Sequence, residues 1–232
     1  MRIVSIILAR GGSKGIPRKN LIDFCGKPLL QWTIEQCQAT REVDSVWVSS
    51  DSEEILDFAN EKGANVIQRP EELASDLATS ESGWLHALDI IESHLGLVDL
   101  VLAPQVTSPL RESTDIEKAL SLFVAGQFDS MFSCSVAEDL YYWQRTANGH
   151  LESVNYDWRN RKRRQEHPPQ YIENGSFYLF KPEVLRRFNN RFGEHIGMVE
   201  IEFWKTFEID SLETMRLCAA LMNEFLIKKD IM

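Results

Sequence analysis

Four basic side chains lie within ten positions near the start of the sequence, directly after an apolar segment at residues 3–9. They are Arg10, Lys14, Arg18 and Lys19. Gly11 and Gly12 lie among them, and glycine lets a backbone turn sharply and approach a ligand closely. Arginine and lysine bind phosphate oxygens through charge-assisted hydrogen bonds. This composition is typical of a loop that holds phosphate groups, although a solvated basic loop would have the same composition.

The spacing of the glycines excludes two common phosphate-binding motifs. The sequence contains no G-x-x-x-x-G-K-[ST] motif, and glycines at positions 11, 12 and 15 do not fit G-x-G-x-x-G. The segment is therefore not a Walker-type loop, and an NAD-dependent oxidoreductase is disfavoured.

The composition of the chain limits the partners that this basic segment can serve. The protein has 232 residues and a formal net charge of −10. An acidic balance argues against general nucleic-acid binding, so the basic cluster indicates a local site for a small anion. No apolar run approaches the ~18 residues of a membrane span. The N-terminal apolar run of only seven residues is followed by Gly-Gly and basic residues rather than by a small-residue cleavage site, which argues against a signal peptide. We expect a cytoplasmic protein without a membrane partner.

The four cysteines form no C-x-x-C pair and have no metal-ligand spacing. Reduced, partly buried thiols are the expected state.

Strand-like and helix-like segments alternate along the first half of the chain. Short runs rich in β-branched residues predict strands at residues 2–9, 44–50, 65–70 and 99–105. Apolar residues at helical spacing predict helices at residues 27–40, 51–63, 79–95 and 113–126. This alternation predicts a mostly parallel α/β sheet with helices on both faces. Ligands of such sheets bind at the carboxyl ends of the strands, where the basic loop lies.

Two helices have recognisable boundaries or faces. Asp51 is expected to be the N-cap of the second helix, with Glu54 completing a capping box and Gly63 ending the helix. Near the C-terminus an apolar stripe is expected to pack into the core. It comprises Leu212, Met215, Ala219, Met222 and Leu226.

The pattern changes between residues 138 and 170. This segment is polar, aromatic and basic, with little periodicity, and it includes the run RNRKRR at residues 159–164. It predicts a hairpin or arm beyond the main sheet, followed by a strand at residues 171–180. The basic run is expected to be a solvated face, with an RNA-binding patch as the alternative.

Several ordered motifs between residues 3 and 226 carry a family resemblance. They are ARGGSKGIPRKN, GKPLL, VSSDSEEI, RPEELASDLATS, QVTSPLR, RRQEHPPQYIENGSFY and FEIDS. In this order they resemble the bacterial CMP-nonulosonic acid synthetases, which activate sialic, legionaminic and pseudaminic acids. The resemblance implies one nucleotidyltransferase domain over residues 1–232, with a doubly wound, Rossmann-like sheet. It also implies a homodimer formed through an arm at about residues 138–170.

The resemblance further implies that CTP and a nonulosonic acid condense to a CMP-sugar and pyrophosphate, with Mg²⁺ as cofactor. The positions that match nucleotide contacts of the family are Leu8, Ala9, Arg10, Gly11, Lys19, Asn20, Arg69, Ala78 and Ser80. Arg10 and Lys19 would hold the phosphates and act in catalysis. Two of these residues have simpler alternatives, because Arg69 could lie on the surface and Ser80 could cap the following helix.

Glu208 and Asp210, in FEIDS, are the candidate Mg²⁺ ligands, and Asp210 is also a candidate catalytic residue. In an extended segment alternate residues point the same way, and Mg²⁺ prefers a few carboxylates together with phosphate oxygens. The family usually has aspartate at both positions, so Glu208 departs from the pattern. Asp210 could instead cap the next helix, with Glu213 completing a capping box.

The resemblance assigns four residues to the acid sugar, namely Gln105, Arg164, Asn174 and Tyr178. The planar guanidinium of Arg164 suits a carboxylate. Two alternatives to the leading function stay open. The protein could be a nucleotidyltransferase for another sugar, or a nucleotide-binding protein without catalytic activity.

Overall fold

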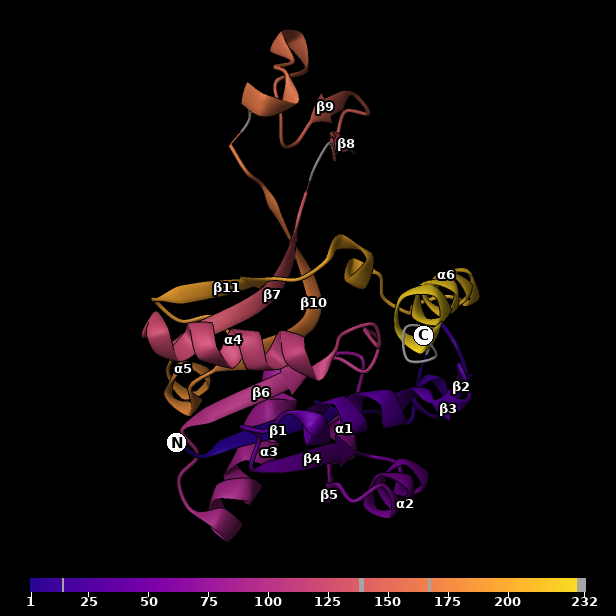
Figure 1. Cartoon of the computed structure of the whole chain (residues 1–232), viewed down its shortest axis with the longest axis vertical. Helices are drawn as coiled ribbons and strands as arrows, with labels where there is room; N and C mark the ends of the chain where they lie inside the picture. Colours follow the sequence, from indigo (N-terminus) through magenta and orange to yellow (C-terminus); the bar gives the residue numbers. More distant parts are fainter. Residues whose placement is uncertain (14, 138–139, 167, 229–232) are drawn as a thin grey trace.

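The computed structural model describes residues 1–13, 15–137, 140–166 and 168–228; Lys14 and the side chain of Arg164 lie outside the described part. Its centre is a seven-stranded sheet in the order β11-β7-β10-β6-β1-β4-β5 (Figure 1). The strands are β1 (Ile3–Leu8), β4 (Ser45–Ser50), β5 (Asn65–Gln68), β6 (Leu100–Pro104), β7 (Ser130–Val136), β10 (Tyr171–Phe180) and β11 (Ile196–Glu200). β10 runs antiparallel to both β6 and β7, and the other pairs are parallel. The predicted mostly parallel α/β sheet is confirmed.

Helices cover both faces of this sheet. One face carries α1 (Leu29–Ala39), α2 (Glu53–Glu61), α4 (Ser113–Ala125) and α6 (Leu212–Met222), and the other carries α3 (Ser80–Leu95) and α5 (Pro182–Phe188). β1 serves both layers because successive side chains of a strand point to opposite faces. Ile3 and Ile7 pack with the first group of helices, whereas Val4 and Ile6 pack with the second.

Shorter elements complete the body. They are the ribbon β2 (Asp23–Phe24) and β3 (Lys27–Pro28), the 3₁₀ turns η1 (Lys19–Leu21), η2 (Glu71–Leu73) and η5 (Phe203–Thr206), and a π-helical turn, η6 (Asn223–Ile227). None of the helices within the described ranges has the length and apolarity to cross a membrane.

The predicted N-cap of α2 is wrong by one residue, and so is the alternative reading of Asp210 as the cap of α6. Ser52, rather than Asp51, precedes α2 as its N-cap, and the carboxylate of Asp51 accepts a hydrogen bond from the Gly11 N–H at 2.9 Å instead. Ser211, rather than Asp210, caps α6 and bonds the Thr214 N–H at 3.1 Å. The carboxylates of Asp51 and Asp210 therefore do not act as helix caps.

The alternative reading of Ser80 as a helix cap is also wrong. The N-cap of α3 is Thr79, whose hydroxyl accepts from the Ser82 N–H at 3.2 Å. The predicted apolar stripe of the last helix is only partly correct. Met222 is buried, but Leu212 at the start of α6 is exposed.

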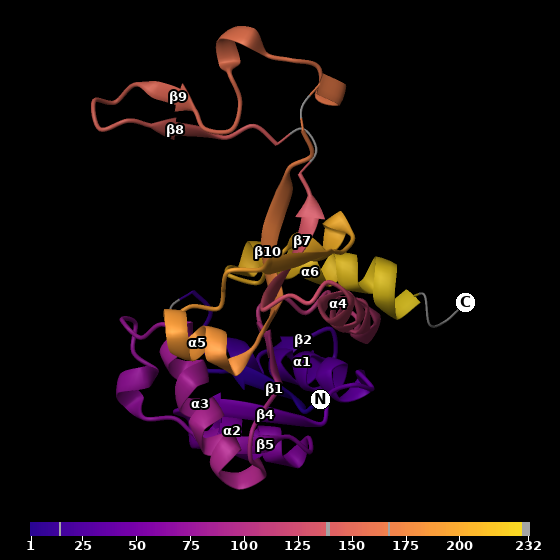
Figure 2. The same ribbon diagram turned by 90° about the vertical axis from the view of Figure 1, so that its left-hand side faces the viewer.

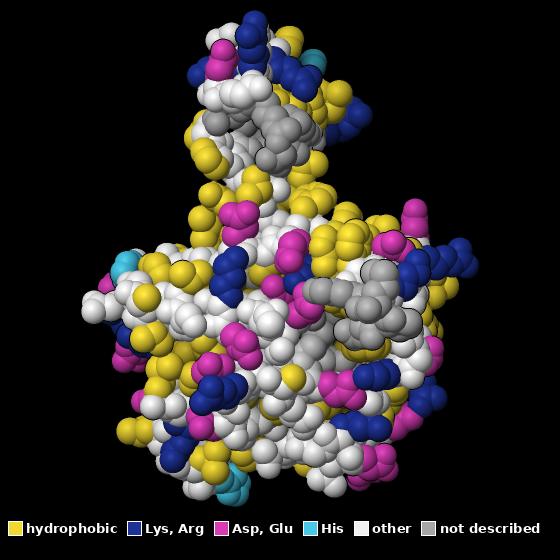
Figure 3. Space-filling model, viewed as in Figure 1, with side chains coloured by type: hydrophobic (Ala, Val, Ile, Leu, Met, Phe, Trp, Pro, Cys, Tyr) yellow, Lys and Arg dark blue, Asp and Glu magenta, His cyan; other side chains and the backbone are white. Residues whose placement is uncertain are grey.

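The predicted hairpin projects from the body as an arm (Figure 2). It contains β8 (Trp143–Arg145), β9 (Leu151–Ser153), η3 (Trp158–Asn160) and η4 (Arg164–Glu166). β7 and β10 lead into the arm and remain paired up to Val136 and Tyr171. Lys and Arg side chains gather at its tip, and apolar side chains lie along the stalk (Figure 3). Residues 159–163 are exposed, as predicted for a solvated basic run.

Candidate active site

The topology of the sheet creates a crevice between β1 and β6. From β1 the chain adds β4 and β5 on one side, and then returns to place β6 on the other. Loops that leave the carboxyl ends of two such strands diverge, and ligands bind between them. Here a hollow of about 360 Å³ lies between the loops after β1 and β6. A second hollow of about 310 Å³ shares Leu8, Arg10 and Ser80 as walls, so the two form one cleft.

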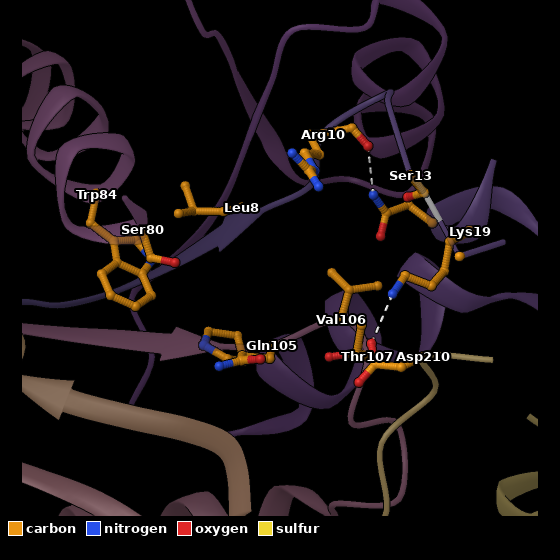
Figure 4. Close-up of a pocket in the computed structure, with 13 residues that line it drawn as sticks. Leu8, Arg10, Ser13, Lys19, Ser80, Trp84, Gln105, Val106, Thr107 and Asp210 are labelled. Atoms are coloured by element: carbon orange, nitrogen blue, oxygen red, sulfur yellow. Dashed lines mark hydrogen bonds and ion pairs between the residues drawn. The ribbon is translucent and has the colours of Figure 1, made fainter. Parts of the chain in front are cut away.

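The close-up of the larger hollow shows how its ends differ (Figure 4). Trp84 and Ser80, from the start of α3, lie at one end. Lys19 and Asp210 meet at the other end, and Gln105 lies on the wall opposite Leu8. Residues from four distant parts of the sequence therefore line one cavity.

The glycine-containing loop after β1 is held by contacts to its backbone. The Asn20 amide donates to the Arg10 carbonyl at 2.8 Å, and the Asp51 carboxylate accepts from the Gly11 N–H. Ala9 is buried, and its N–H bonds the Ser49 carbonyl at 3.0 Å. A Cβ added at Gly15 would lie 2.5 Å from the Asp210 carbonyl oxygen. The loop is thus packed closely against the segment that carries the acidic pair.

Arg10 and Lys19 each face a carboxylate across the cleft. Arg10 Nη1 forms an ion pair with Asp76 Oδ1 at 2.9 Å, and both side chains are partly exposed to solvent. Lys19 Nζ lies 3.1 Å from Asp210 Oδ1 and 3.2 Å from the Ile209 carbonyl oxygen. The Lys19 side chain is 16% exposed and that of Asp210 is 70% exposed. Such solvated pairs are weak, so an anionic ligand can replace the carboxylates.

Glu208 is placed beside Asp210, as the extended-segment argument predicted. Its carboxylate accepts a hydrogen bond from the Thr107 hydroxyl at 3.3 Å. Gly175 makes room for it, since a Cβ there would lie 2.5 Å from Glu208 Oε1. Burial, and then the negative charge of Asp210, raise the pKa of Glu208 above its usual value. A cation between the two carboxylates would relieve this repulsion.

The donor set of this acidic pair fits Mg²⁺. Within the described residues there is no cluster of three or more His, Cys, Asp or Glu side chains, and the four cysteines are free thiols. Mg²⁺ is commonly held by one or two carboxylates, with phosphate oxygens and water completing its shell. Glu208 and Asp210 offer that arrangement next to the basic loop.

Arg69 lines the second hollow together with Leu8, Ala78 and Ser80. Only 5% of the accessible surface of Arg69 is exposed, so the alternative reading of a surface arginine is wrong. Burial lowers the pKa of its guanidinium, and its Nε has no hydrogen-bond partner among the residues that the structure describes. A buried donor without a partner is costly. A ligand bound in this hollow could accept a hydrogen bond from the Nε–H of Arg69.

The four residues predicted to contact the acid sugar are placed differently from one another. Gln105 lines the larger hollow. Tyr178 is buried behind Trp84 with ring centroids 6.4 Å apart, and its hydroxyl donates to Glu173 at 2.7 Å. Asn174 is also buried, and its side chain bonds two serine hydroxyls of β7. Arg164 begins η4 in the arm. Of the three whose side chains the structure describes, Gln105 is the one that lines the cavity.

Three residues of the site were not assigned to it from the sequence. Trp84 lies one turn into α3, where it is buried and also forms part of the cavity wall. Thr107 lies two residues after Gln105 and contacts Glu208. Asp51 holds the glycine loop. The motif QVTSPLR was a sufficient signal for Thr107, whereas the contact of Asp51 depends on tertiary structure.

Sheet order and site together define an α/β fold whose ligand cleft lies at the switch in strand order. The family profile described as cytidylyltransferase matches residues 4–231, so the chain belongs to the cytidylyltransferase family. It is 36% identical over 191 residues to an N-acylneuraminate cytidylyltransferase of Oncorhynchus mykiss, covering 80% of this chain and 42% of that protein. It is 30% identical over 225 residues to a pseudaminic acid cytidylyltransferase of Campylobacter jejuni, covering 95% and 96% of the two chains.

The chain thus spans less than half the length of the Oncorhynchus mykiss relative and nearly all of the Campylobacter jejuni relative. Among solved structures it is similar in fold to a CMP:2-keto-3-deoxy-manno-octonic acid synthetase in complex with CTP. The TM-score is 0.74 with 16% identity, over 97% of this chain and 100% of that chain. The fold of this chain is therefore one on which other cytidylyltransferases are built.

Proposed function

We propose that this protein transfers CMP from CTP to a free nonulosonic acid and releases pyrophosphate. The observation that carries the proposal is the cleft that Arg10, Lys19 and Asp210 line together, in which the Lys19 ammonium contacts the Asp210 carboxylate. The Glu208 carboxylate lies close enough to feel the charges of both Asp210 and Lys19. The named activities of the relatives, on N-acylneuraminate and on pseudaminic acid, support this substrate class.

The two hollows suggest how the substrates divide the cleft. The nucleotide would enter the hollow lined by Leu8, Arg69, Ala78 and Ser80, with its phosphates along the glycine loop beside Arg10 and Lys19. The acid sugar would lie against Gln105, with the arm residue Arg164 as a further proposed contact. Both reacting groups then meet above the acidic pair.

Asp210 and Glu208 are the residues that would hold Mg²⁺. When bound, Mg²⁺ supplies positive charge that offsets the phosphate charge of the transition state. In the free protein Lys19 holds the Asp210 carboxylate at the end of the cleft. Thr107 holds that of Glu208. These contacts keep both side chains close to the place where phosphate oxygens would arrive.

The proposed chemistry is an in-line displacement. The anomeric hydroxyl oxygen forms a bond to the α-phosphorus, the bond from that phosphorus to the bridging oxygen breaks, and pyrophosphate leaves with the electron pair. The hydroxyl proton passes to water. Such reactions depend on positioning and charge stabilisation more than on covalent participation by the protein. Arg10 and Lys19 would stabilise the charge that collects on the leaving pyrophosphate.

The arm supports a second part of the proposal, namely that the protein acts as a homodimer. Exposed aromatic and aliphatic side chains gather there, including Tyr142, Trp143, Leu151 and Trp158. Aromatic residues and arginine are enriched at protein interfaces, and Arg159 stacks on Trp158 at 4.4 Å. A second copy of the chain would cover these rings.

A pyrophosphate-release assay tests the activity. The purified protein is incubated with Mg²⁺, one of CTP, UTP, ATP or GTP, and one of N-acetylneuraminate, legionaminate, pseudaminate or 3-deoxy-octulosonate. We expect release with CTP and a nonulosonate, and its loss on chelation of Mg²⁺. Release only with a different sugar or nucleotide would indicate another nucleotidyltransferase. CTP binding without release for any acid would indicate a binding protein.

A further inference from the structure

Arg111 carries a positive charge in the interior of the protein. It is 1% exposed and belongs to the loop that joins β6 to α4. Nη1 donates to the carbonyl oxygens of Gln105, Ser108 and Ser176 at 2.9, 2.6 and 3.1 Å. Nη2 donates to the Thr33 hydroxyl at 2.7 Å. All four hydrogen-bond acceptors are neutral.

A charge buried in this way is costly for the stability of the fold. Removing an ion from water is unfavourable, and replacing buried charges by apolar groups is often neutral or stabilising. Burial lowers the pKa of Arg111 to about 10. Asp115 acts on it electrostatically, but the Asp115 carboxylate is hydrogen-bonded to Lys205 at 2.8 Å. Stability alone therefore gives little reason for an arginine at this position.

The acceptors of Arg111 belong to the backbone that shapes one end of the cleft. Gln105 lines the cavity, and its N–H donates to the same Ser176 carbonyl at 3.0 Å. Thr107, in the same loop, accepts from the Ile209 N–H at 2.8 Å and donates its hydroxyl to Glu208. The loop at residues 105–108 is therefore the support for both Gln105 and the acidic segment at residues 208–210.

We propose that Arg111 is a positioning residue that fixes the loop at residues 105–108 against β10 at Ser176. Through this loop it orients Gln105 toward the acid sugar and holds the carboxylates of Glu208 and Asp210 where both can bind Mg²⁺. The inference rests on the proposed function for its substrates. Arg69 and Ala78, which line the nucleotide hollow, are not among its hydrogen-bond partners. The effect of losing Arg111 is therefore confined to the acid-sugar and metal end.

The test compares Arg111→Met and Arg111→Lys with the unchanged protein. Arg111→Met keeps an unbranched apolar side chain without the donors, and Arg111→Lys restores the charge on one nitrogen. For Arg111→Met we expect the KM of the acid sugar and the Mg²⁺ concentration for half-maximal rate to rise about tenfold or more. The Kd of CTP measured by calorimetry without metal stays within about twofold. Arg111→Lys recovers part of the loss.

A direct binding measurement keeps this result separate from the activity itself. Mn²⁺ binding, followed by electron paramagnetic resonance, is expected to weaken about tenfold in Arg111→Met even without substrates. If the unchanged protein releases no pyrophosphate, the proposed function fails, while the Mn²⁺ comparison still tests the positioning of the acidic pair. Should Arg111→Met not fold, the same split between metal and CTP affinity is measured with Arg111→Lys.

Leu120→Ala is the matched control. Leu120 is buried in α4, the helix that begins just after Arg111. It belongs to the hydrophobic core between the sheet and the helices α1, α2, α4 and α6. A large-to-small change there lowers the melting temperature through a cavity and leaves the loop at residues 105–108 in place. Unchanged constants in Arg111→Met would overturn the inference. It would equally be overturned by a loss of metal and CTP affinity together, in proportion to the loss of stability.

Discussion

Lys19 joins the two halves of the proposed site, because it rises from the basic loop and its ammonium group contacts Asp210. Lys19→Ala should slow pyrophosphate release with CTP by about 10²-fold or more, the scale of losing one group that stabilises developing charge. Steady-state kinetics measure the effect. Lys27→Gln is the control, since Lys27 pairs with Glu35 outside the cleft. A Lys19→Ala rate within twofold of the unchanged protein would remove Lys19 from the mechanism.

Substitutions at Asp210 and Ser211 distinguish the proposed role of a metal ligand from that of a helix cap. Asp210→Asn should raise the Mg²⁺ concentration for half-maximal rate about tenfold or more, because one carboxylate is lost from a two-carboxylate site. Its melting temperature should stay unchanged, because Ser211 caps α6. Ser211→Ala should show the opposite pattern, losing about 1 kcal/mol of stability at an unchanged Mg²⁺ requirement. Titrations with Mg²⁺ and thermal unfolding of both variants decide between the roles.

Glu208 makes the free protein less stable at neutral pH. Its folded pKa is raised by burial and by Asp210, so the folded protein binds this proton more tightly than the unfolded chain. The contribution of Glu208 to the free energy of unfolding therefore falls as the pH rises from about 4.5 through the raised pKa. Glu208→Gln should unfold at a higher temperature than the unchanged protein above that window and bind Mg²⁺ less tightly. An unchanged difference between the two melting temperatures from pH 4 to 8 would contradict this account.

Individual residues of the site differ in how far the sequence alone could place them. Lys19, Gln105 and Asp210 were predicted together because their motifs resemble one family, and the structure brings all three to one cavity. Asp51 was interpreted as a cap because Asp and Ser are both good N-cap residues. Only the approach of the Gly11 N–H, forty positions earlier, decides between Asp51 and Ser52.

At the scale of elements, Gly15 controls how closely the basic loop packs on the acidic segment. Gly15→Ala places a Cβ 2.5 Å from the Asp210 carbonyl oxygen, so the two segments must separate. We expect the KM for CTP and the Mg²⁺ requirement to rise together by about tenfold. Gly12→Ala changes the same loop, but its Cβ meets no atom within 4 Å, and its constants should change less than those of Gly15→Ala. Equal kinetic effects of the two substitutions would mean that loop flexibility, rather than close approach, explains the glycines.

The elements that the sequence predicted have a continuous apolar run or apolar residues at a clear period. β1 is such a run, buried along almost its whole length, and α3 has its buried residues at helical spacing. β7 was missed because Ser130, Ser133 and Ser135 make its sequence look polar. All three serines are nevertheless buried, and their hydroxyls donate to neighbouring Asp129, to Asn174 and to the Ile201 carbonyl, respectively. Ser133 and Ser135 find these partners far along the chain, so their burial has no local sequence signal.

At the scale of the molecule, the protein has a net charge of −10, whereas its cleft is lined by the basic residues Arg10 and Lys19. The alternation of strands and helices was sufficient to predict a parallel sheet with the ligand at its carboxyl edge. It did not predict that β10 would be inserted antiparallel between β6 and β7. That insertion allows the chain to leave the body on β7, form the arm and return on β10.

The arm determines the last prediction, which concerns assembly. Trp143 and Trp158 are 46% and 47% exposed, with ring centroids 6.3 Å apart. Large rings left in water favour association, because burying an aromatic side chain removes about 150–250 Å² from solvent. Sedimentation equilibrium of the unchanged protein at micromolar concentration should therefore give a dimer, and Trp143→Ser with Trp158→Ser should give a monomer with an unchanged melting temperature of the body.

Leu97→Ser is the control for this assembly experiment. Leu97 is 80% exposed, but it lies between α3 and β6 on the body, away from the arm. Its substitution removes a similar kind of exposed apolar group and should leave the dimer intact. If exposed apolar residues associate without regard to position, Leu97→Ser weakens the dimer as much as the double substitution does. If the arm is the interface, only the double substitution shifts the mass, and a monomeric unchanged protein would refute the dimer altogether.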